Sequence, residues 1–397
     1  MNKPVKQHLI DPEICIRCNT CEETCPIDAV THNDDNYVVL AEKCNFCMSC
    51  IAPCPTGAID NWRVVLEAYP IDEQFEWFEL PEQEEISGAA EAAESDDAVE
   101  DDVARLLHEA HEGAGGKVHP PASASAPSIN LYNRKHPLTA VVQGNYRLTA
   151  PDAESDIRHI ILSAGNHNFP VLEGQSVGVI PPGTDRIGNP HAPRLYSISS
   201  ARDGERPNTN NFSLTVKREP EGICSNYLCD LKKGDTVELT GPFGATFLMP
   251  NDTEADIVMI CTGTGSAPFR AFTERRRRTA PNANGKLHLF FGARRPEELP
   301  YFGPLKKVPT KLLVQNLVFS RLPDRPKEYV QDRMRNEGAT LSELLQKATT
   351  HIYVCGLKGM ETGVDEALDE ISREAGLSWD AIKSEMRENG RYHVETY

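Results

Sequence analysis

The chain has 397 residues, of which 39% are hydrophobic and 25% are charged, and its formal net charge is -18. This length predicts two to four domains, and no apolar run approaches the roughly 20 residues that a membrane-spanning helix needs. Sixteen acidic residues and one basic residue lie between Asp72 and Glu112, so most of the net charge belongs to that segment. The composition therefore argues against a membrane protein and against a nucleic-acid-binding protein, which would need a basic face.

The first 66 residues contain two copies of one cysteine pattern, C-x2-C-x2-C-x3-C followed by proline. The copies are Cys15, Cys18, Cys21 and Cys25 before Pro26, and Cys44, Cys47, Cys50 and Cys54 before Pro55. This spacing is typical of metal ligands rather than of a disulfide framework, and it is the run that ligates iron–sulfur clusters in bacterial proteins. Structural zinc is the alternative, but zinc ligands come in pairs and need no evenly spaced third cysteine.

We therefore predict two [4Fe–4S] clusters in a domain over residues 1–66. Each tight loop supplies three thiolates, and the fourth thiolate crosses to the other loop. The expected first set is Cys15, Cys18, Cys21 and Cys54, and the expected second set is Cys44, Cys47, Cys50 and Cys25. Thiolate ligands suit a reducing compartment, and the N-terminal residues lack an apolar signal segment, so we expect a cytoplasmic protein.

Residues 67–130 change in composition from a few aromatic residues to an Ala/Glu/Asp-rich stretch that ends in Gly, Ser and Pro. Few apolar side chains and many like charges leave too little burial to offset the entropy of ordering the chain. We predict an acidic flexible linker here, with a short helix around Val99–Glu112.

The rest of the chain predicts two further domains, over residues 131–250 and 251–397. Short apolar strands separated by Gly and Pro predict an antiparallel β-barrel, and they lie at 138–142, 157–162, 194–199, 211–216 and 236–240. Apolar strands that alternate with helix-like segments predict a parallel-sheet α/β domain, and they lie at 257–261, 287–291, 312–319 and 351–355. The four arginines at 275–278 are expected to form the solvated end of a helix.

Three motifs in these domains suit a flavin and a nicotinamide dinucleotide. Arg194, Tyr196 and Ser197 offer a cation for a pyrophosphate, an aromatic face and a hydroxyl from a single strand. Gly222 opens a turn before a helix, and a helix N-terminus binds phosphate. The loop 261–270 follows a buried strand, where glycines let the backbone approach a pyrophosphate.

Two resemblances add to these predictions. Residues 8–62 resemble bacterial two-cluster ferredoxins. Residues 137–397 resemble the plant-type ferredoxin–NADP reductase family, through RLYSIS at 194–199, LTVK at 214–217, GICSN at 222–226, LTGPFG at 239–244, TGTGSAPFR at 262–270, VCGLKGM at 354–360 and the terminal VETY at 394–397. The resemblance implies an FAD-binding β-barrel and an NADP-binding α/β domain.

The resemblance to the reductases also implies roles for individual residues. Arg194 and Ser225 would hold the FAD pyrophosphate, Tyr196 would pack on one flavin face, and Ser197 would approach N5. Tyr397 would cover the other flavin face, and Cys355 and Glu395 would border the site of hydride transfer. The 2′-phosphate of NADP would contact Ser320, Arg321 and, in a loop shorter than is usual, Tyr329. The remaining implied cofactor contacts are Lys217, Gly222, Cys224, Thr262, Gly263, Thr264 and Gly265.

This combination predicts an NADPH-dependent oxidoreductase in which electrons pass from NADPH through FAD and the clusters to an external acceptor. The fused arrangement resembles the reductase components of benzoyl-CoA 2,3-epoxidases, which implies a separate di-iron oxygenase as acceptor in the breakdown of aromatic compounds. Two alternatives remain. One is a self-contained ferredoxin–NADP reductase that works towards NADPH, and the other is a non-enzymatic electron carrier.

Overall fold

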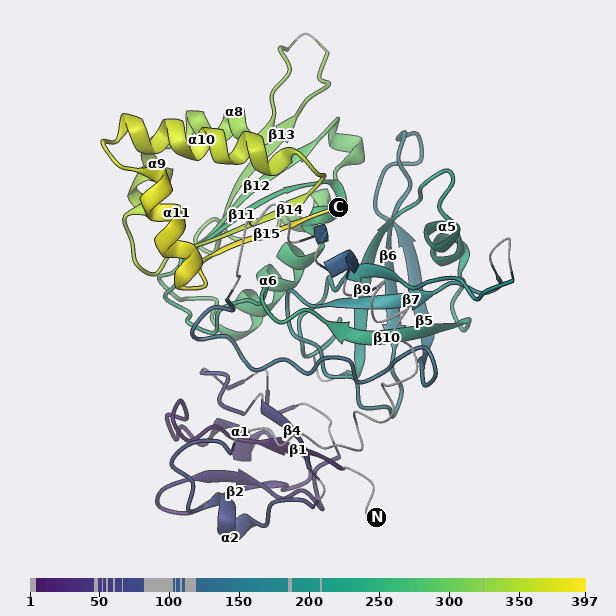
Figure 1. Cartoon of the computed structure of the whole chain (residues 1–397), viewed down its shortest axis with the longest axis vertical. Helices are drawn as coiled ribbons and strands as arrows, with labels where there is room; N and C mark the ends of the chain where they lie inside the picture. The colour runs from purple at the N-terminus through teal and green to yellow at the C-terminus, as the bar shows by residue number, and fades with distance from the viewer. Residues whose placement is uncertain are drawn as a thin grey trace.

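A computed structural model shows the chain arranged around three groups of strands (Figure 1). The described residues are 5–45, 49–51, 53–54, 56–59, 61–65, 67–81, 103, 105–107, 109–110, 119–184, 188–207, 209–323 and 325–397. Cys47, Pro55 and most of the acidic segment lie outside these ranges. Of the helix predicted around Val99–Glu112, the described residues within 103–110 are helical.

The cysteine-rich unit is formed by the first two strand pairs. Its elements are β1 (Val5–Leu9), α1 (Thr20–Glu23), β2 (Val30–His32), β3 (Tyr37–Val39), β4 (Asn61–Val65) and α2 (Ile71–Gln74). Strand β1 pairs antiparallel with β4, and β2 pairs antiparallel with β3. Gln74 donates to the Val39 carbonyl at 3.2 Å, and Tyr69 N–H donates to the Gln7 side chain at 2.7 Å. Residues 67–81 therefore pack on this unit, beyond the boundary predicted at residue 66.

The antiparallel unit is a six-stranded sheet in the order β8-β7-β10-β5-β6-β9. A bridge between Ile198 and Leu214 joins its two edges and closes the sheet into the expected barrel. Among the strands of this sheet, β7 was not predicted from the sequence. The elements are β5 (Leu138–Arg147), β6 (Ile157–Ser163), β7 (Ser176–Ile180), β8 (Arg194–Ser197), β9 (Asn211–Lys217), α5 (Ile223–Asp230) and β10 (Thr236–Phe243).

The parallel unit is a five-stranded sheet in the order β13-β12-β11-β14-β15, with every neighbouring pair parallel. Its strands are β11 (Ile257–Thr262), β12 (Leu287–Ala293), β13 (Leu313–Phe319), β14 (His351–Gly356) and β15 (Tyr392–Thr396). Its helical segments are η2 (Gly263–Gly265), α6 (Ser266–Thr279), η3 (Pro296–Glu298), α7 (Phe302–Leu305), α8 (Val330–Asn336), α9 (Gly338–Leu345), α10 (Met360–Glu374) and α11 (Trp379–Glu388).

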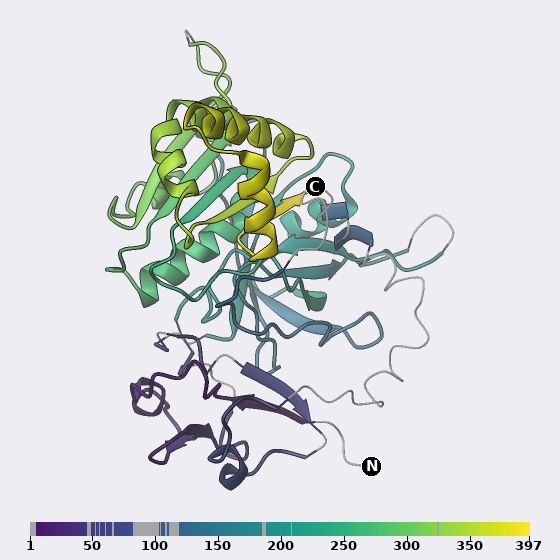
Figure 2. The ribbon, with the colours of Figure 1, turned by 60° about the vertical axis from the view of Figure 1, so that its left-hand side comes forward.

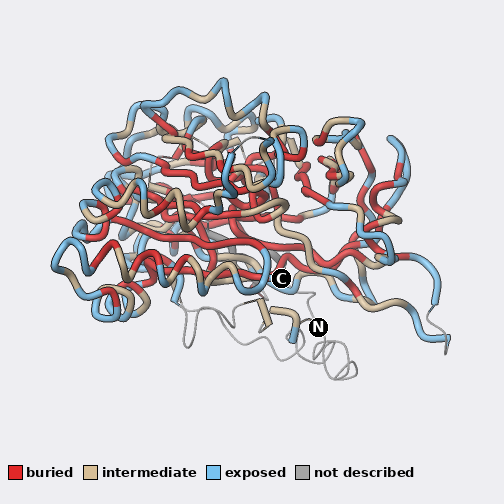
Figure 3. The backbone as a smooth tube through the Cα atoms, turned by 90° about the horizontal axis from the view of Figure 1, so that it is seen from above, coloured by how far each residue is buried: buried red, intermediate tan, exposed pale blue. Residues whose placement is uncertain are grey.

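Helices lie on both faces of the parallel sheet, and the cysteine-rich unit lies against the other two units (Figure 2). The central strands β11 and β14 are buried almost throughout, because a parallel sheet covered on both faces has no solvent side. Figure 3 shows long buried runs of backbone through the interior of the molecule. In the part of the chain that the structure describes, no helix is long and apolar enough to cross a membrane.

The prediction that the four arginines after Glu274 are solvated is wrong for two of them. Arg275 and Arg276 are 7% and 2% exposed. Arg276 donates to the backbone carbonyls of Gly285 and Ala255 at 2.9 and 3.1 Å, so it ties the end of α6 to the loops beneath the sheet. These bonds satisfy a cation whose burial would otherwise be costly.

Candidate functional site

Two small cavities in the cysteine-rich unit are lined by different cysteines. One is lined by Cys15, Cys18, Cys21 and Cys54, together with apolar side chains that include Ile10 and Ile59. The other is lined by Cys25, Cys44 and Cys50, with Val30 and Val39 among the apolar side chains around them. Cys54 thus lies with the cysteines of the first loop, and Cys25 lies with those of the second. This is the crossed arrangement that two cubane clusters require.

The chemistry of the first set fits a metal cluster. Burial, followed by the neighbouring Cys54 and Cys15, raises the pKa of the Cys21 thiol to about 12. Burial also raises the pKa of Cys15, with Cys54 and Cys18 adding to the effect. Converging thiols that resist ionisation on their own become thiolates when a metal supplies the positive charge. A metal bound among Cys15, Cys18, Cys21 and Cys54 would therefore convert these thiols to thiolates.

A cavity of about 380 Å³ opens beside β8 and the start of α5. Arg194 and Tyr196 line it from the strand, and Gly222, Cys224 and Ser225 line it from the helix N-terminus. A Cβ on Gly222 would lie 2.3 Å from the Ser225 hydroxyl oxygen, so this tight turn excludes a side chain. A guanidinium, an aromatic ring and a helix N-terminus around one cavity fit a flavin with its pyrophosphate.

The surroundings of Tyr196 keep its side chain uncharged. Burial and the neighbouring Cys224 raise the pKa of the Tyr196 hydroxyl. Burial raises the pKa of the Cys224 thiol to about 11. Ser197 is the last residue of β8 and pairs with Ser176 on β7, so the register fixes its place next to the aromatic residue. Tyr196 thus presents a neutral aromatic group to the cavity, whereas Ser197 is not among the residues that line it.

A larger cavity of about 600 Å³ lies between the antiparallel and parallel units. Lys217 lines it from the end of β9, and Thr262, Gly263 and Thr264 line it from the carboxyl end of β11. Ligands of open parallel sheets bind at this edge. Glu219 lines this cavity and the one beside β8, so the two cavities meet at that residue.

Cations gather at the far end of the larger cavity. Ser320, Arg321 and Tyr329, which the sequence analysis expects to contact the 2′-phosphate, line it, and so do Arg294 and Lys327, which the sequence analysis did not name. Lys327 could have been predicted from the sequence, because it lies two residues before Tyr329 in a loop expected to bind phosphate. Glu154 of the antiparallel unit lies 2.9 Å from Arg294 and 3.5 Å from Arg321. These exposed ion pairs contribute little, so a phosphate dianion can displace the carboxylate.

Tyr397 also lines the larger cavity, and hydrogen bonds hold both its side-chain hydroxyl and its backbone. Its hydroxyl is 2.6 Å from the Thr264 hydroxyl, and its backbone N–H donates to the Gly356 carbonyl at 3.0 Å. Cys355 and Glu395 are paired neighbours on β14 and β15, and both are buried. A Cβ on Gly265 would lie 2.1 Å from the Cys355 carbonyl oxygen, so η2 packs directly on that strand.

Comparison with known proteins decides the family. Residues 7–55 match the 4Fe-4S dicluster domain, residues 156–247 the oxidoreductase FAD-binding domain, and residues 259–366 the oxidoreductase NAD-binding domain. The ferredoxin–NADP reductase of Spirulina sp is 38% identical over 288 residues, which cover 68% of this chain and 98% of that protein. The cyanelle ferredoxin–NADP reductase of Cyanophora paradoxa is 38% identical over 287 residues, which cover 68% of this chain and 79% of that protein.

The chain belongs to the ferredoxin–NADP reductase family. Solved structures agree. The ferredoxin–NADP+ reductase of Plasmodium falciparum matches with a TM-score of 0.55 and 27% identity, covering 68% of this chain and 99% of that one. The form of that enzyme with 2'P-AMP matches with a TM-score of 0.56 and 26% identity, covering 68% of this chain and all of that one.

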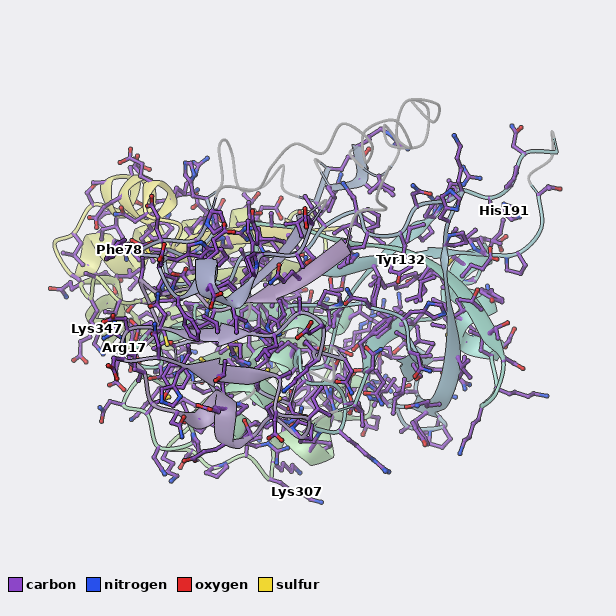
Figure 4. The ribbon with its side chains drawn as sticks, turned by 90° about the horizontal axis from the view of Figure 1, so that it is seen from below. Arg17, Phe78, Tyr132, His191, Lys307 and Lys347 are labelled. Atoms are coloured by element: carbon purple, nitrogen blue, oxygen red, sulfur yellow. The ribbon has the colours of Figure 1, made fainter. Side chains whose placement is uncertain are left out.

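The chain is an NADPH-dependent oxidoreductase with FAD- and NADP-binding domains and a 4Fe-4S dicluster domain. One reductase feature had no predicted role, the loop at 187–192. The described part of this loop places His191 and Ala192 on the wall of the cavity beside β8. Figure 4 shows His191 on a loop that projects from the body of the reductase. The loop therefore extends the wall of the candidate flavin cavity outwards.

Proposed function

We propose that this chain passes electrons from NADPH to a separate di-iron oxygenase, as the reductase component of a benzoyl-CoA 2,3-epoxidase. The observation that carries the proposal is the pair of crossed cysteine cavities in a chain that is also a reductase of NADPH type. A reductase that uses a separate ferredoxin needs no such unit of its own. A fused two-cluster unit supports delivery of single electrons to an enzyme that must reduce O2.

The residues around the larger cavity would bind NADPH. Arg321 and Lys327 supply positive charge for the 2′-phosphate, and the glycine-rich turn at Gly263 lets the backbone approach the pyrophosphate. Tyr397 occupies the place into which a nicotinamide would move. The Thr264 hydroxyl bonded to Tyr397 would release the ring when the nicotinamide enters.

The residues beside β8 would hold the flavin. Arg194 and the N-terminus of α5 would hold its pyrophosphate, and Tyr196 would support the ring from one side, with Ser197 next to it. When bound, FAD and two [4Fe–4S] clusters would supply the conversion of a hydride into single electrons. The two cysteine sets would bind these clusters as Cys15, Cys18, Cys21 and Cys54, and as Cys25, Cys44, Cys47 and Cys50.

The test is an anaerobic titration of the holoprotein with NADPH, followed by addition of a benzoyl-CoA epoxidase oxygenase with benzoyl-CoA and O2. We expect flavin and cluster absorbance to bleach together, and NADPH consumption to become dependent on the oxygenase and its substrate. Cluster bleaching without any effect of the oxygenase would contradict the proposed acceptor.

A second candidate is reduction of NADP+ by the chain's own ferredoxin-type unit. The names of the matched reductases favour this direction of electron flow. It predicts that chemically reduced holoprotein forms NADPH from NADP+ faster than it reduces the oxygenase.

A further inference from the structure

Among the described residues, the cysteine-rich unit contacts the reductase at Gly57, three residues after Cys54. A Cβ placed on Gly57 would lie 2.5 Å from the side-chain nitrogen of Asn251, so the Asn251 side chain packs against the backbone of the cysteine loop. Gly57 has φ of +74°, a conformation that favours glycine. Figures 1 and 2 show the unit lying against the reductase on this side, and Figure 4 looks onto the same side from below.

Asn251 belongs to a chain of hydrogen bonds that leads into the reductase. Its Nδ2 donates to the Ser125 hydroxyl at 2.8 Å, and Nη1 of Arg202 donates to the same oxygen at 2.9 Å. Ser125 is 5% exposed, so this residue, which precedes the barrel, is a built part of the contact. The Gly57 loop therefore rests on an ordered polar network rather than on mobile surface side chains.

The far end of this network is a buried ion pair. Nη2 of Arg202 lies 2.8 Å from Oε2 of Glu173, and Arg202 N–H donates to Oε1 of Glu173 at 2.7 Å. The side chains of this pair are 2% and 0% exposed. In a buried ion pair with this geometry, losing one partner leaves the other charge unpaired in the interior, which is strongly destabilising. The two side chains are therefore held rigidly together.

A second guanidinium leaves this region with an excess of positive charge. Arg275 is 7% exposed, and its Nη1 has no hydrogen-bond partner among the described residues. Burial raises the pKa of Glu173, the positive charge of Arg275 opposes this, and the nearby Asp203 adds to it. Asp203 is itself paired with Arg278 at 2.7 Å, so three guanidiniums share this region with two carboxylates. Cys54 is close enough for its thiolate to interact electrostatically with Arg202. Four thiolates around a cluster give it net negative charge, which suits this positive region.

The same network adjoins the strands that carry the candidate flavin residues. Ile198 N–H, directly after Ser197, donates to the Gln175 carbonyl at 2.9 Å, and Gln175 lies two residues after Glu173. Arg202 follows Ser197 by five residues, so the Cα atoms of these residues can be at most about 17 Å apart, even in an extended chain. The positive region thus lies within a short reach of the flavin strand and directly under the cysteine loop.

We propose that the reductase face formed by Asn251, Ser125 and the buried Arg202–Glu173 pair, with Arg275 behind it, is the docking site for the edge of the ferredoxin-type unit that holds the Cys15, Cys18, Cys21 and Cys54 set. The inference rests on the proposed two-cluster function and adds which edge faces the flavin. The acidic segment then tethers a unit that has a specific place to dock, which raises the local concentration of the docked form.

The test uses full-length holoprotein carrying Asn251→Arg, which places a bulky cation where Gly57 now packs. Its control is Asn336→Arg, the same change on an exposed residue at the end of α8, away from the cysteine-rich unit in Figure 1. Small-angle X-ray scattering reports docking, and stopped-flow absorbance at anaerobic mixing with NADPH reports cluster reduction separately from flavin reduction.

We expect Asn251→Arg to increase the radius of gyration and to slow cluster reduction about tenfold, because the unit must then find the flavin from an undocked ensemble. Flavin reduction by NADPH should keep its wild-type rate, and Asn336→Arg should change neither measurement. An unchanged radius and an unchanged rate of cluster reduction in Asn251→Arg would overturn the proposal. If wild-type clusters fail to accept electrons from NADPH at all, the proposed function fails, and scattering still tests the docking face.

Discussion

At the scale of single residues, we propose that Tyr397 influences which dinucleotide is used. Its ring lines the larger cavity, its hydroxyl is hydrogen-bonded to the Thr264 hydroxyl, and its backbone N–H donates to the Gly356 carbonyl. In the proposed site a nicotinamide would have to displace this ring, and aromatic packing of this kind is worth about 0.5–1.5 kcal/mol. NADH lacks the 2′-phosphate that would anchor NADPH at the far end, so NADH depends more on the nicotinamide contact.

We therefore expect Tyr397→Ser to raise kcat/KM for NADH by about two- to tenfold and to relax the preference for NADPH. Tyr397→Phe is the matched control, because it keeps the ring and removes only the bond to Thr264. Steady-state kinetics with both dinucleotides and ferricyanide would measure the effect. Equal NADH kinetics in Tyr397→Ser and wild type would argue against the assigned role.

Arg321 carries the opposite expectation, since it lines the part of the cavity where we propose that the 2′-phosphate binds. Charge-assisted bonds to a phosphate are worth about 1.5–3 kcal/mol, so Arg321→Ala should lower kcat/KM for NADPH by about 10- to 100-fold. NADH kinetics serve as the internal control and should change little. If both dinucleotides lose the same factor, the 2′-phosphate is bound elsewhere.

At the scale of elements, each of the two proposed cluster sets takes one cysteine from the other loop. Cys54 lies in the cavity of the first loop, so Cys54→Ser should remove one cluster and leave the other. Iron content should fall from about eight to about four atoms per chain, and EPR should show one reduced centre. Cys229→Ser, at a buried cysteine in α5, is the control and should keep all the iron. Loss of both clusters from Cys54→Ser would contradict independent crossed sets.

Strand β14 begins at a histidine that makes the parallel unit sensitive to acid. Burial, helped by the charge of Arg391, lowers the pKa of His351 to about 4. Its unfolded pKa is about 6.5, so between these values the unfolded chain binds more protons and stability falls as the pH falls. The expected loss from pH 7 to pH 4 is about 3 kcal/mol.

Urea unfolding followed by fluorescence of the buried Trp379 at several pH values measures this loss. His351→Phe keeps a ring stacked near Tyr353, whose centroid lies 6.4 Å away, and it removes the titrating group. The pH profile should become flatter in this variant. An equally steep profile would assign the acid sensitivity to another group, such as His288, whose pKa burial also lowers.

The elements that the sequence predicted are those with a strong local signal. The buried run before Gly263 predicts β11 because a parallel strand covered on both faces is continuously apolar. Strand β7 was missed because its sequence, SVGVI, is short and contains a glycine whose place is fixed by packing against Thr240 and Phe243. Burial of Arg275 and Arg276 was missed because a run of four arginines has no local sign of the loops that cover two of them.

The candidate cofactor residues were likewise predicted where a local sequence motif marks them. Arg194 and Gly263 lie in motifs, and the structure places both on cavity walls. Glu154 and Arg294 come from different units and meet only through the tertiary fold. The Arg202–Glu173 pair likewise joins residues 29 positions apart, and neither residue belongs to a motif. No pattern within one stretch of sequence encodes such pairs.

On the scale of the whole molecule, a buried polar network fixes the antiparallel unit to the parallel unit. Glu205 accepts from Arg270 of α6 at 2.5 and 3.0 Å and from Ser213 of β9 at 2.9 Å. His159 of β6 lies 3.2 Å from the same carboxylate and 3.0 Å from the Tyr301 hydroxyl. Although burial alone would raise it, the bonds from His159 and Arg270 hold the pKa of Glu205 well below its usual range.

This network predicts that the two units unfold together. Arg270→Met leaves a buried carboxylate without its main partner, which costs about 3–5 kcal/mol, whereas Arg270→Met/Glu205→Gln removes both charges and should cost less than the sum of the single changes. In a background in which Trp62 and Trp77 of the cysteine-rich unit are replaced by Phe, Trp379 fluorescence reports the parallel unit, and release of fluorescent FAD reports the antiparallel unit. The two signals should coincide on heating wild type, and they should separate in Arg270→Met. In the double variant they should move back together, since a neutral interface carries no unpaired charge to drive the units apart. Additive losses in the double variant would show that Glu205 and Arg270 stabilise their own units independently.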